Sequence, residues 1–183
     1  IRDVAPSRGL GDVYKRQLLD YHRSVAAGGI GMTTVAYAAV TQSGLSFDRQ
    51  LWMRPEIIPG LRRLTDAIHA EGAAAGIQLG HCGNMSHKSI CGCMPVGASS
   101  GFNLYSPTFV RGLRADELPE MARAYGRSVN LAREAGFDSV EIHAGHGYLI
   151  SQFLSPSTNH RKDEFGGSLQ NRMRFMDMVM EEV

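Results

Sequence analysis

The sequence predicts an α/β fold built around a parallel β-sheet. Three observations support this prediction: segments of helical and strand character alternate about three times, the strand segments are short and almost continuously apolar, and the loops after strands are longer than the loops after helices. Strands covered on both faces have this composition, and such alternation is typical of parallel sheets flanked by helices. In these folds the functional side chains collect at the carboxyl ends of the strands.

The predicted elements follow one another without a gap that would divide the chain. Glycines mark the ends of the first three helices, and Ser168 is the expected N-cap of the last one, whose apolar stripe is formed by Met173, Met176 and Met180. The pattern predicts helices within 18–29, 55–72, 115–136 and 166–183, strands within 30–40, 73–80 and 137–144, and a long loop at 81–114.

The composition fits one folded domain and excludes several classes of protein. The chain has 183 residues, of which 43% are hydrophobic and 20% charged, with a formal net charge of +1. No basic run indicates a nucleic-acid surface, and no apolar run reaches the roughly 20 residues that span a membrane. No secretory signal is visible, and three cysteines are too few for a disulfide framework. We therefore expect a cytoplasmic protein with no nucleic-acid or membrane partner.

The start of the chain differs from the rest. Residues 1–17 show neither helical nor strand periodicity and lead abruptly into the helix predicted from Leu18. We expect 1–17 to be a non-native or disordered prefix and 18–183 to form the domain. An ordinary flexible terminus has the same composition.

The segment at 140–161 carries the strongest indication of chemistry. Alternation along the strand turns Glu141 and His143 to one face, and His146 and Tyr148 follow in the loop. Two imidazoles can hold a carbonyl or nitro oxygen and withdraw electrons from it, while a tyrosine hydroxyl can protonate a developing carbanion. This set suits the addition of hydride to an electron-poor double bond.

Two other interpretations of the histidines stay open. His143 and His146 with His81 could ligate a metal in a metal-dependent hydrolase, although no recognised zinc-hydrolase motif is present. A structural histidine pair is the second alternative. Cys91 and Cys93 could also bind metal, but such a short motif is a weak signal, and we expect no metal site.

The residues at 136–175, "GFDSVEIHAGHGYLISQFLSPSTNHRKDEFGGSLQNRMRF", resemble the signature segment of the Old Yellow Enzyme family, the FMN-dependent NADH:flavin oxidoreductases and ene-reductases. Upstream, "AAGGIGMTTVAYAAV" and "LRRLTDAIHAEGAAAGIQLGHCG" follow the family in order and spacing. The resemblance covers nearly all of 18–183, whereas 1–17 match nothing in it.

The resemblance implies a TIM barrel with FMN at its carboxyl-end mouth and a role for each site residue. His143 and His146 correspond to the pair that binds the activating oxygen of the substrate, and Tyr148 to the proton donor. Gln78 corresponds to the glutamine that hydrogen-bonds the flavin, and Tyr37 and Ala38 to the backbone segment near its ring system. Other signature residues are expected to be structural, namely Arg161, Asp163, Glu164, Asn171 and Arg172.

The implied activity is that of an FMN-dependent oxidoreductase. NAD(P)H reduces the flavin, which then passes hydride to an activated alkene or a related small electrophile while the tyrosine supplies the proton. No residue identifies the substrate or distinguishes NADH from NADPH.

A complete (β/α)₈ barrel has about 250 residues, whereas this chain provides roughly three βα units. We therefore expect a partial TIM barrel, the N-terminal half of a family member, with its phosphate-binding loops beyond Val183. Such a half has lost the main anchor of FMN and is expected to be impaired alone. An inactive or self-associating half-barrel, present as a homo-oligomer, is the alternative.

Overall fold

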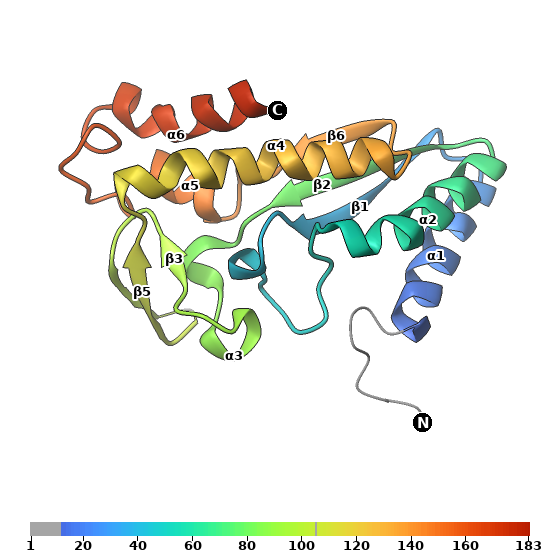
Figure 1. Cartoon of the computed structure of the whole chain (residues 1–183), viewed down its shortest axis with the longest axis horizontal. Helices are drawn as coiled ribbons and strands as arrows, with labels where there is room; N and C mark the ends of the chain where they lie inside the picture. Colours follow the sequence, from blue (N-terminus) through green and yellow to red (C-terminus); the bar gives the residue numbers. More distant parts are fainter. Residues whose placement is uncertain (1–11, 105) are drawn as a thin grey trace.

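The main sheet has three parallel strands in the order β1-β2-β6 (Figure 1). The structure is a computed structural model that describes residues 12–104 and 106–183, so residues 1–11 of the expected prefix lie outside the described residues. The strands are β1 (Met32–Ala39), β2 (Ala74–Gly80) and β6 (Ser139–Ile142). The predicted parallel α/β fold is confirmed.

The helices of the main layer also match the predicted segments. They are α1 (Asp12–Ala27), α2 (Ile58–Ala70), α4 (Leu118–Glu134) and α6 (Leu169–Glu182). Helix α1 begins six residues before Leu18, so 12–17, part of the expected prefix, are helical. Short elements complete the chain: η1 (Gln42–Gly44), η2 (Pro55–Ile57), η3 (Gly83–Met85), α3 (Lys88–Cys91), β3 (Val96–Gly97), β4 (Gly101–Asn103), β5 (Thr108–Gly112), η4 (Ala115–Glu117) and α5 (Leu149–Leu154).

The two faces of the main sheet differ. On one face Ile77 and Leu79 of β2 are fully buried and join a core formed with α2 and α4. Alternation places Gln78 and Glu141 on the opposite face, where they pair in register. Ala36 on this face is exposed. The second face is therefore polar and open to solvent.

The prediction of one long loop at 81–114 is wrong in part. The segment contains a second sheet with strand order β3-β5-β4. Phe102 and Phe109 face each other across the β4–β5 pair, with ring centroids 5.2 Å apart. Strands of two to five residues are too short to show alternation, which explains why the sequence gives no sign of them.

Helix α6 begins as predicted but buries a different face. Ser168 Oγ accepts a hydrogen bond from the Asn171 N–H at 3.2 Å, which confirms the N-cap. Met173 and Met180 are 40% and 49% exposed, whereas Met176 is partly buried against the core, so the predicted methionine stripe is wrong in part. Phe175 and Val179 are buried instead, because α6 lies against α4 and α5 (Figure 1).

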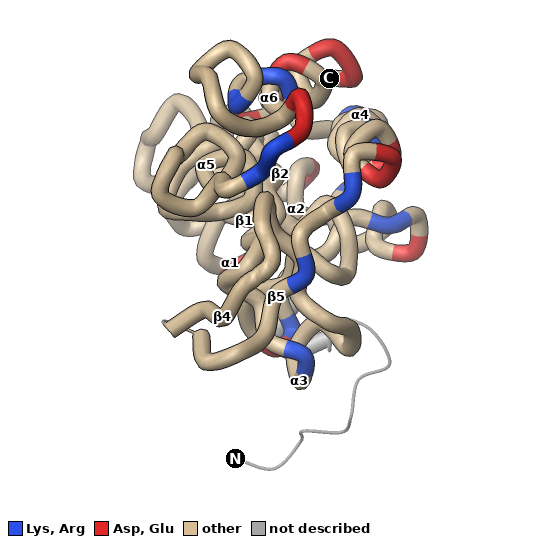
Figure 2. The backbone as a smooth tube through the Cα atoms, turned by 90° about the vertical axis from the view of Figure 1, so that its left-hand side faces the viewer, with Lys and Arg blue, Asp and Glu red and all other residues tan. Residues whose placement is uncertain are grey.

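The charged residues of the signature segment tie the loops together, as expected. Arg161 pairs with Asp163, and its guanidinium donates to the carbonyl oxygens of Ala98 and Leu113. Figure 2 shows basic and acidic residues lying next to one another before α6. Glu164 is exposed.

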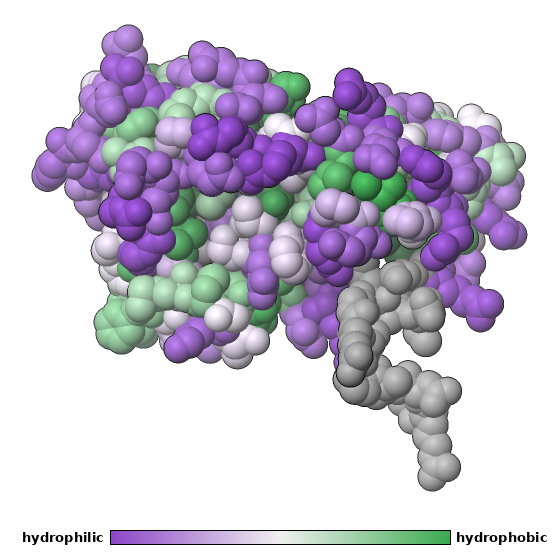
Figure 3. Space-filling view, in the orientation of Figure 1, coloured by the Kyte–Doolittle hydropathy of each residue, from purple (hydrophilic) through white to green (hydrophobic). Residues whose placement is uncertain are grey.

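The surface shows two further features. An apolar area covers the β4–β5 hairpin (Figure 3), where Phe102, Leu104 and Phe109 are all more than half exposed. Within 12–104 and 106–183, no helix has the length and apolarity that crossing a membrane requires.

Candidate active site

Four aromatic rings meet at the carboxyl edge of the main sheet. They belong to Tyr37, His143, His146 and Tyr148, which we call the mouth cluster. The ring of His143 lies 4.8 Å from that of Tyr148 and 5.0 Å from that of His146, and Tyr37 lies 5.3 Å from Tyr148. The structure thus brings together the three residues predicted for substrate binding and proton transfer.

A β-bulge in β1 places Tyr37 in this cluster. Val35 pairs with Ile77 and Ala38 with Leu79, so Ala36 and Tyr37 together oppose the single residue Gln78. The extra residue turns Tyr37 toward the polar face, where its ring approaches His143 and Tyr148. The Tyr37 hydroxyl donates to the Gly44 carbonyl at 3.0 Å, and burial raises its pKa. Sequence reasoning assigned Tyr37 only a backbone role.

The loop after β6 has an unusual backbone. His146 and Gly147 have positive φ angles of 55° and 68°, and Tyr148 then forms the N-cap of α5. Left-handed backbone is uncommon for a residue other than glycine, and such conformations cluster at functional sites. This turn brings the His146 ring back toward His143.

The two histidines are in direct contact. His146 Nδ1 lies 3.2 Å from His143 Nε2, and one of the two nitrogens donates the hydrogen. His143 is buried at 8% exposure, whereas His146 is exposed. Burial, and then the neighbouring His146, lower the pKa of His143, so its imidazole is neutral at pH 7. A neutral ring donates one hydrogen bond without carrying a charge.

Gln78 lies on the polar face of the sheet and not in the mouth cluster. Its amide nitrogen donates to Glu141 Oε1 at 2.6 Å. Ala38, which pairs with Leu79, is fully buried and faces the core, so only its backbone is available at the edge. Alternation in "SVEIHA" already placed Glu141 on this face, although the sequence suggested no contact for it.

Gln152 supports the loop and was missed from the sequence. It is 1% exposed, and its amide nitrogen donates to the carbonyl oxygens of Gly147 at 2.6 Å and Cys82 at 3.3 Å. It also exchanges hydrogen bonds with Asn84, accepting from its N–H and donating to its Oδ1. A Cβ at Gly83 would lie 2.4 Å from the Gln152 side chain, so glycine is required there. The polar type of Gln152 inside an apolar stretch is the signal that could have found it.

His81 is not placed to be a metal ligand. It is fully buried, and burial lowers its pKa to about 3. Its Nδ1 accepts a hydrogen bond from the Gly83 N–H at 2.9 Å, which leaves Nε2 to donate to Ser43 Oγ at 3.0 Å. The described part of the chain contains no group of three metal-ligating side chains. The metal-hydrolase alternative has no support.

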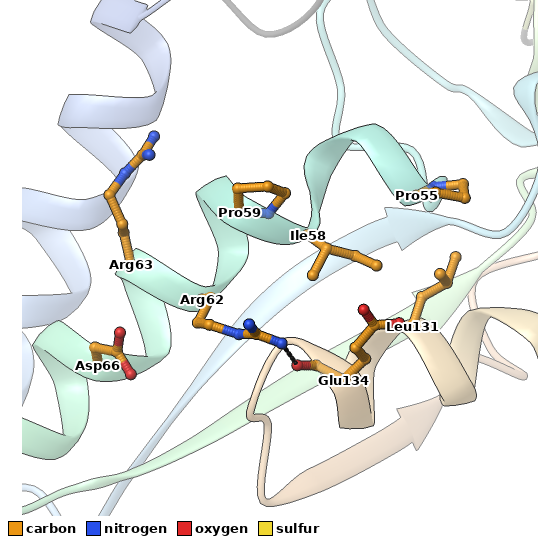
Figure 4. Close-up of a pocket in the computed structure, with 8 residues that line it drawn as sticks. All are labelled: Pro55, Ile58, Pro59, Arg62, Arg63, Asp66, Leu131 and Glu134. Carbon is orange, nitrogen blue, oxygen red and sulfur yellow. Dashed lines mark hydrogen bonds between the residues drawn. The ribbon is translucent and has the colours of Figure 1, made fainter.

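A groove between η2, α2 and α4 has a volume of about 530 Å³ (Figure 4). Arg62 crosses it and donates to the Glu134 carbonyl oxygen at 2.6 Å. Because no residue of a strand end lines this groove, we place the candidate site at the mouth cluster.

Comparison with known proteins decides the family. The sequence model of the NADH:flavin oxidoreductase / NADH oxidase family matches residues 7–183. The chain belongs to this family. The match begins at residue 7, so it includes most of the segment 1–17 that we expected to lie outside the resemblance.

Relatives of the flavin oxidoreductase family support this assignment. A Rhodococcus erythropolis protein named 4,4'-dithiodibutanoate disulfide reductase is 40% identical over 166 residues, which are 91% of this chain and 41% of the relative. A Bacillus subtilis (strain 168) protein named NADPH dehydrogenase is 38% identical over 164 residues, 89% of this chain and 48% of the relative.

A solved member of the flavin oxidoreductase family has the same fold. The old yellow enzyme homologue from Zymomonas mobilis superposes with a TM-score of 0.83 at 31% identity, over 90% of this chain and 49% of that protein. The predicted partial TIM barrel is confirmed: the match covers about half of a barrel, and the described sheet is not closed. This chain spans about half the length of the relatives it matches.

Proposed function

We propose that this chain forms the substrate-facing part of an FMN-dependent oxidoreductase that uses NAD(P)H to reduce activated C=C bonds. The observation that carries the proposal is the contact of His143 with both His146 and Tyr148 at the carboxyl edge of a parallel sheet. Family membership supports an oxidoreductase that acts on small molecules. The roles of the histidine pair and Tyr148 extend this proposal to an activated alkene.

The histidine pair binds the oxygen that activates the substrate. His143 Nε2 and His146 Nδ1 lie 3.2 Å apart and hydrogen-bond to each other, and His143 is desolvated. A substrate oxygen that binds between the two rings replaces this contact and accepts a hydrogen bond from each of them. Donors held by a buried framework stabilise negative charge on a carbonyl or nitro oxygen more than water does, because they need no reorganisation. The positive φ of His146 fixes the donor geometry before the substrate arrives.

Tyr148 is the proton donor. Its ring stands edge-on to His143 at an interplanar angle of 83° and lies against Tyr37. A phenol held between two rings has few rotamers, so its hydroxyl is fixed relative to the histidines that bind the substrate. Such positioning is what general acid catalysis by a side chain requires.

The residues beside the cluster fit a flavin ring. Ala36 leaves the sheet face open near the strand ends, and Gln78, which donates one amide hydrogen to Glu141, offers its second amide hydrogen and its amide oxygen at the edge of this face. Gln78 would hold the polar edge of the ring, with the backbone of Tyr37 and Ala38 beside it. FMN, when bound, supplies the hydride, and NAD(P)H reduces it.

The first experiment is a titration of the purified chain with FMN, followed by visible absorption and flavin fluorescence. The proposal predicts a perturbed flavin band and quenched fluorescence, both weakened by Gln78→Ala. Gln170→Ala, an exposed glutamine on α6, is the matched control and should bind as the wild type does.

Turnover then tests the roles of the side chains in the same flavin-loaded sample. Tyr148→Phe should slow reduction of an α,β-unsaturated ketone by at least about tenfold while leaving flavin reduction by NADPH unchanged. A disulfide is included as a second acceptor, because one relative is named for such a substrate. Equal loss of both half-reactions would exclude Tyr148 as the proton donor, and failure of Gln78→Ala to weaken FMN binding would exclude the flavin contact.

A further inference from the structure

Two cysteines outside the mouth cluster lie close enough to react with each other. Cys91 ends α3, and Gly92 turns the chain with a φ of 74°. This turn brings the Sγ atoms of Cys91 and Cys93 to 3.6 Å. A disulfide has an S–S distance of about 2 Å, so a small side-chain movement is enough to form the bond.

The two sulfurs differ in exposure. Cys91 is 1% exposed, whereas Cys93 is open to solvent. An incoming reagent can therefore reach only Cys93, and Cys91 stands directly behind it. This order, with an accessible thiol and a buried neighbour, is what a two-step exchange requires.

Cys93 also lines a cavity of about 620 Å³. Apolar side chains line part of it, among them Met94, Leu113 and Met121, and the ion pair of Arg111 with Glu117 also lines it. Cavities of this volume accommodate small organic molecules.

A metal site is not the better explanation of the pair. The nearest histidine in sequence, His87, uses Nδ1 to accept the Ser89 N–H and lies 2.7 Å from the Ser89 hydroxyl. Within 12–104 and 106–183, no third metal-ligating side chain joins the two cysteines. The chemistry left to two adjacent thiols is thiol–disulfide exchange.

We propose that Cys91 and Cys93 form a dithiol that reduces small organic disulfides bound in the cavity beside Cys93. The Cys93 thiolate attacks the disulfide, forms a mixed disulfide and releases one thiol. The Cys91 thiolate then attacks Cys93 Sγ, releases the second thiol and closes the Cys91–Cys93 bond. The substrate disulfide gains two electrons and two protons, and the cysteine pair loses them, so no flavin or nicotinamide takes part.

The surroundings predict slow exchange at neutral pH. Burial and the contact with Cys91 raise the pKa of Cys93 to about 11, and the Arg111 charge only partly opposes them. Because the thiolate is the nucleophile, the rate of exchange should rise steadily as the pH is raised from 7 toward this pKa.

The test uses the whole chain with oxidised glutathione and with neither flavin nor nicotinamide. After reaction the chain is denatured, free thiols are alkylated, and tryptic peptides are weighed. Peptide 89–111 contains both cysteines of the pair, and peptide 64–88 contains Cys82. We expect peptide 89–111 to lose two hydrogen atoms and both alkylation sites, while Cys82 stays fully alkylated, and dithiothreitol should reverse the change.

Variants separate the two steps. Cys91→Ser should retain a stable glutathione adduct on Cys93, Cys93→Ser should carry neither adduct nor internal bond, and Cys82→Ser should behave as the wild type does. Cys91→Ala repeats the first test with an apolar side chain suited to the buried position, and circular dichroism checks that each variant is folded. A stable adduct on wild-type Cys93, or an unchanged peptide at pH 9, would overturn the proposal.

Discussion

The amide of Gln152 donates to the carbonyl oxygen of Gly147 at 2.6 Å, and this bond holds the turn that carries His146 and Tyr148. The same side chain reaches Cys82 and Asn84 after β2. One buried amide therefore connects the loops that follow two neighbouring strands.

We predict that Gln152→Ala lowers the free energy of unfolding by about 2–4 kcal/mol. The substitution leaves buried carbonyl groups without donors and opens a cavity. Urea unfolding followed by circular dichroism measures the change. Gln170→Ala, at an exposed position, should stay within about 0.5 kcal/mol of the wild type. Equal midpoints for the two variants would show that Gln152 does not support the loop.

His81 should make the fold sensitive to acid. Its pKa is about 3 in the folded chain, below the ordinary value of 6.5, because it is buried. Between these values the unfolded state binds a proton that the folded state does not, so the stability rises with pH and falls as pH drops from 6.5 toward 3. In this window His81→Gln should reduce the slope of stability against pH by up to about 1.4 kcal/mol per unit. Urea unfolding at several pH values gives the slope, and an unaltered slope would contradict the prediction. His160→Gln, at an exposed position, is the control.

The Arg161–Asp163 pair should act in the same sense as His81, but at lower pH. The Arg161 hydrogen bonds lower the pKa of Asp163 below its ordinary value of 3.8. The stabilisation is therefore present above the ordinary pKa and is lost as pH falls through the lower, folded value. Because Asp163 is partly exposed, we expect Asp163→Asn to cost only about 1 kcal/mol at pH 7. The difference from the wild type should shrink as the pH is lowered below 3.8 in the same unfolding measurement, whereas Asp177→Asn, at an exposed position of α6, should be neutral throughout. A difference that persists at low pH would assign the effect to packing.

The buried face of α6 can be tested directly. Phe175 is fully buried with its ring 4.6 Å from that of Phe153, whereas Met180 is 49% exposed. Phe175→Ala should destabilise the chain by about 3–5 kcal/mol and Met180→Ala by less than about 1 kcal/mol, measured as a shift in thermal midpoint. Equal shifts in thermal midpoint for the two variants would contradict the assignment of Phe175, rather than Met180, to the packed face of α6.

The sequence predicted the helices, the strands and the faces of the strands better than the side chains that each helix buries. The strand alternation that set Glu141 and His143 on one face is present, since Glu141 pairs in register with Gln78 and His143 follows at the same edge. The apolar face of α6 could not be predicted, because the helix carries two apolar stripes with helical spacing. One contains Phe175 and Val179, and the other, shifted by one residue, contains Met176 and Met180. Only the packing against α4 and α5 selects between them.

The candidate site was predicted as a set of residues but not as a geometry. Tyr148, His143 and His146 were found from their spacing and resemblance, whereas the support by Gln152 depends on a loop 68 residues away in sequence. The β1 bulge was hidden, since an almost uniformly apolar strand gives no alternation that an extra residue could interrupt.

The extra residue in β1 uncouples the position of a residue along the strand from the face of the sheet on which its side chain lies. In a regular strand every second side chain lies on the same face of the sheet. Tyr37, two residues after Val35, would then point into the core beside the helices. Ala36 breaks the link, and Tyr37 emerges beside the histidines while Ala38 returns to the core without any change in strand direction. A bulge of this kind allows the residue at the mouth cluster to be changed independently of the packing behind it. Regular pairing of the same residues, without the bulge, would reverse both assignments at once.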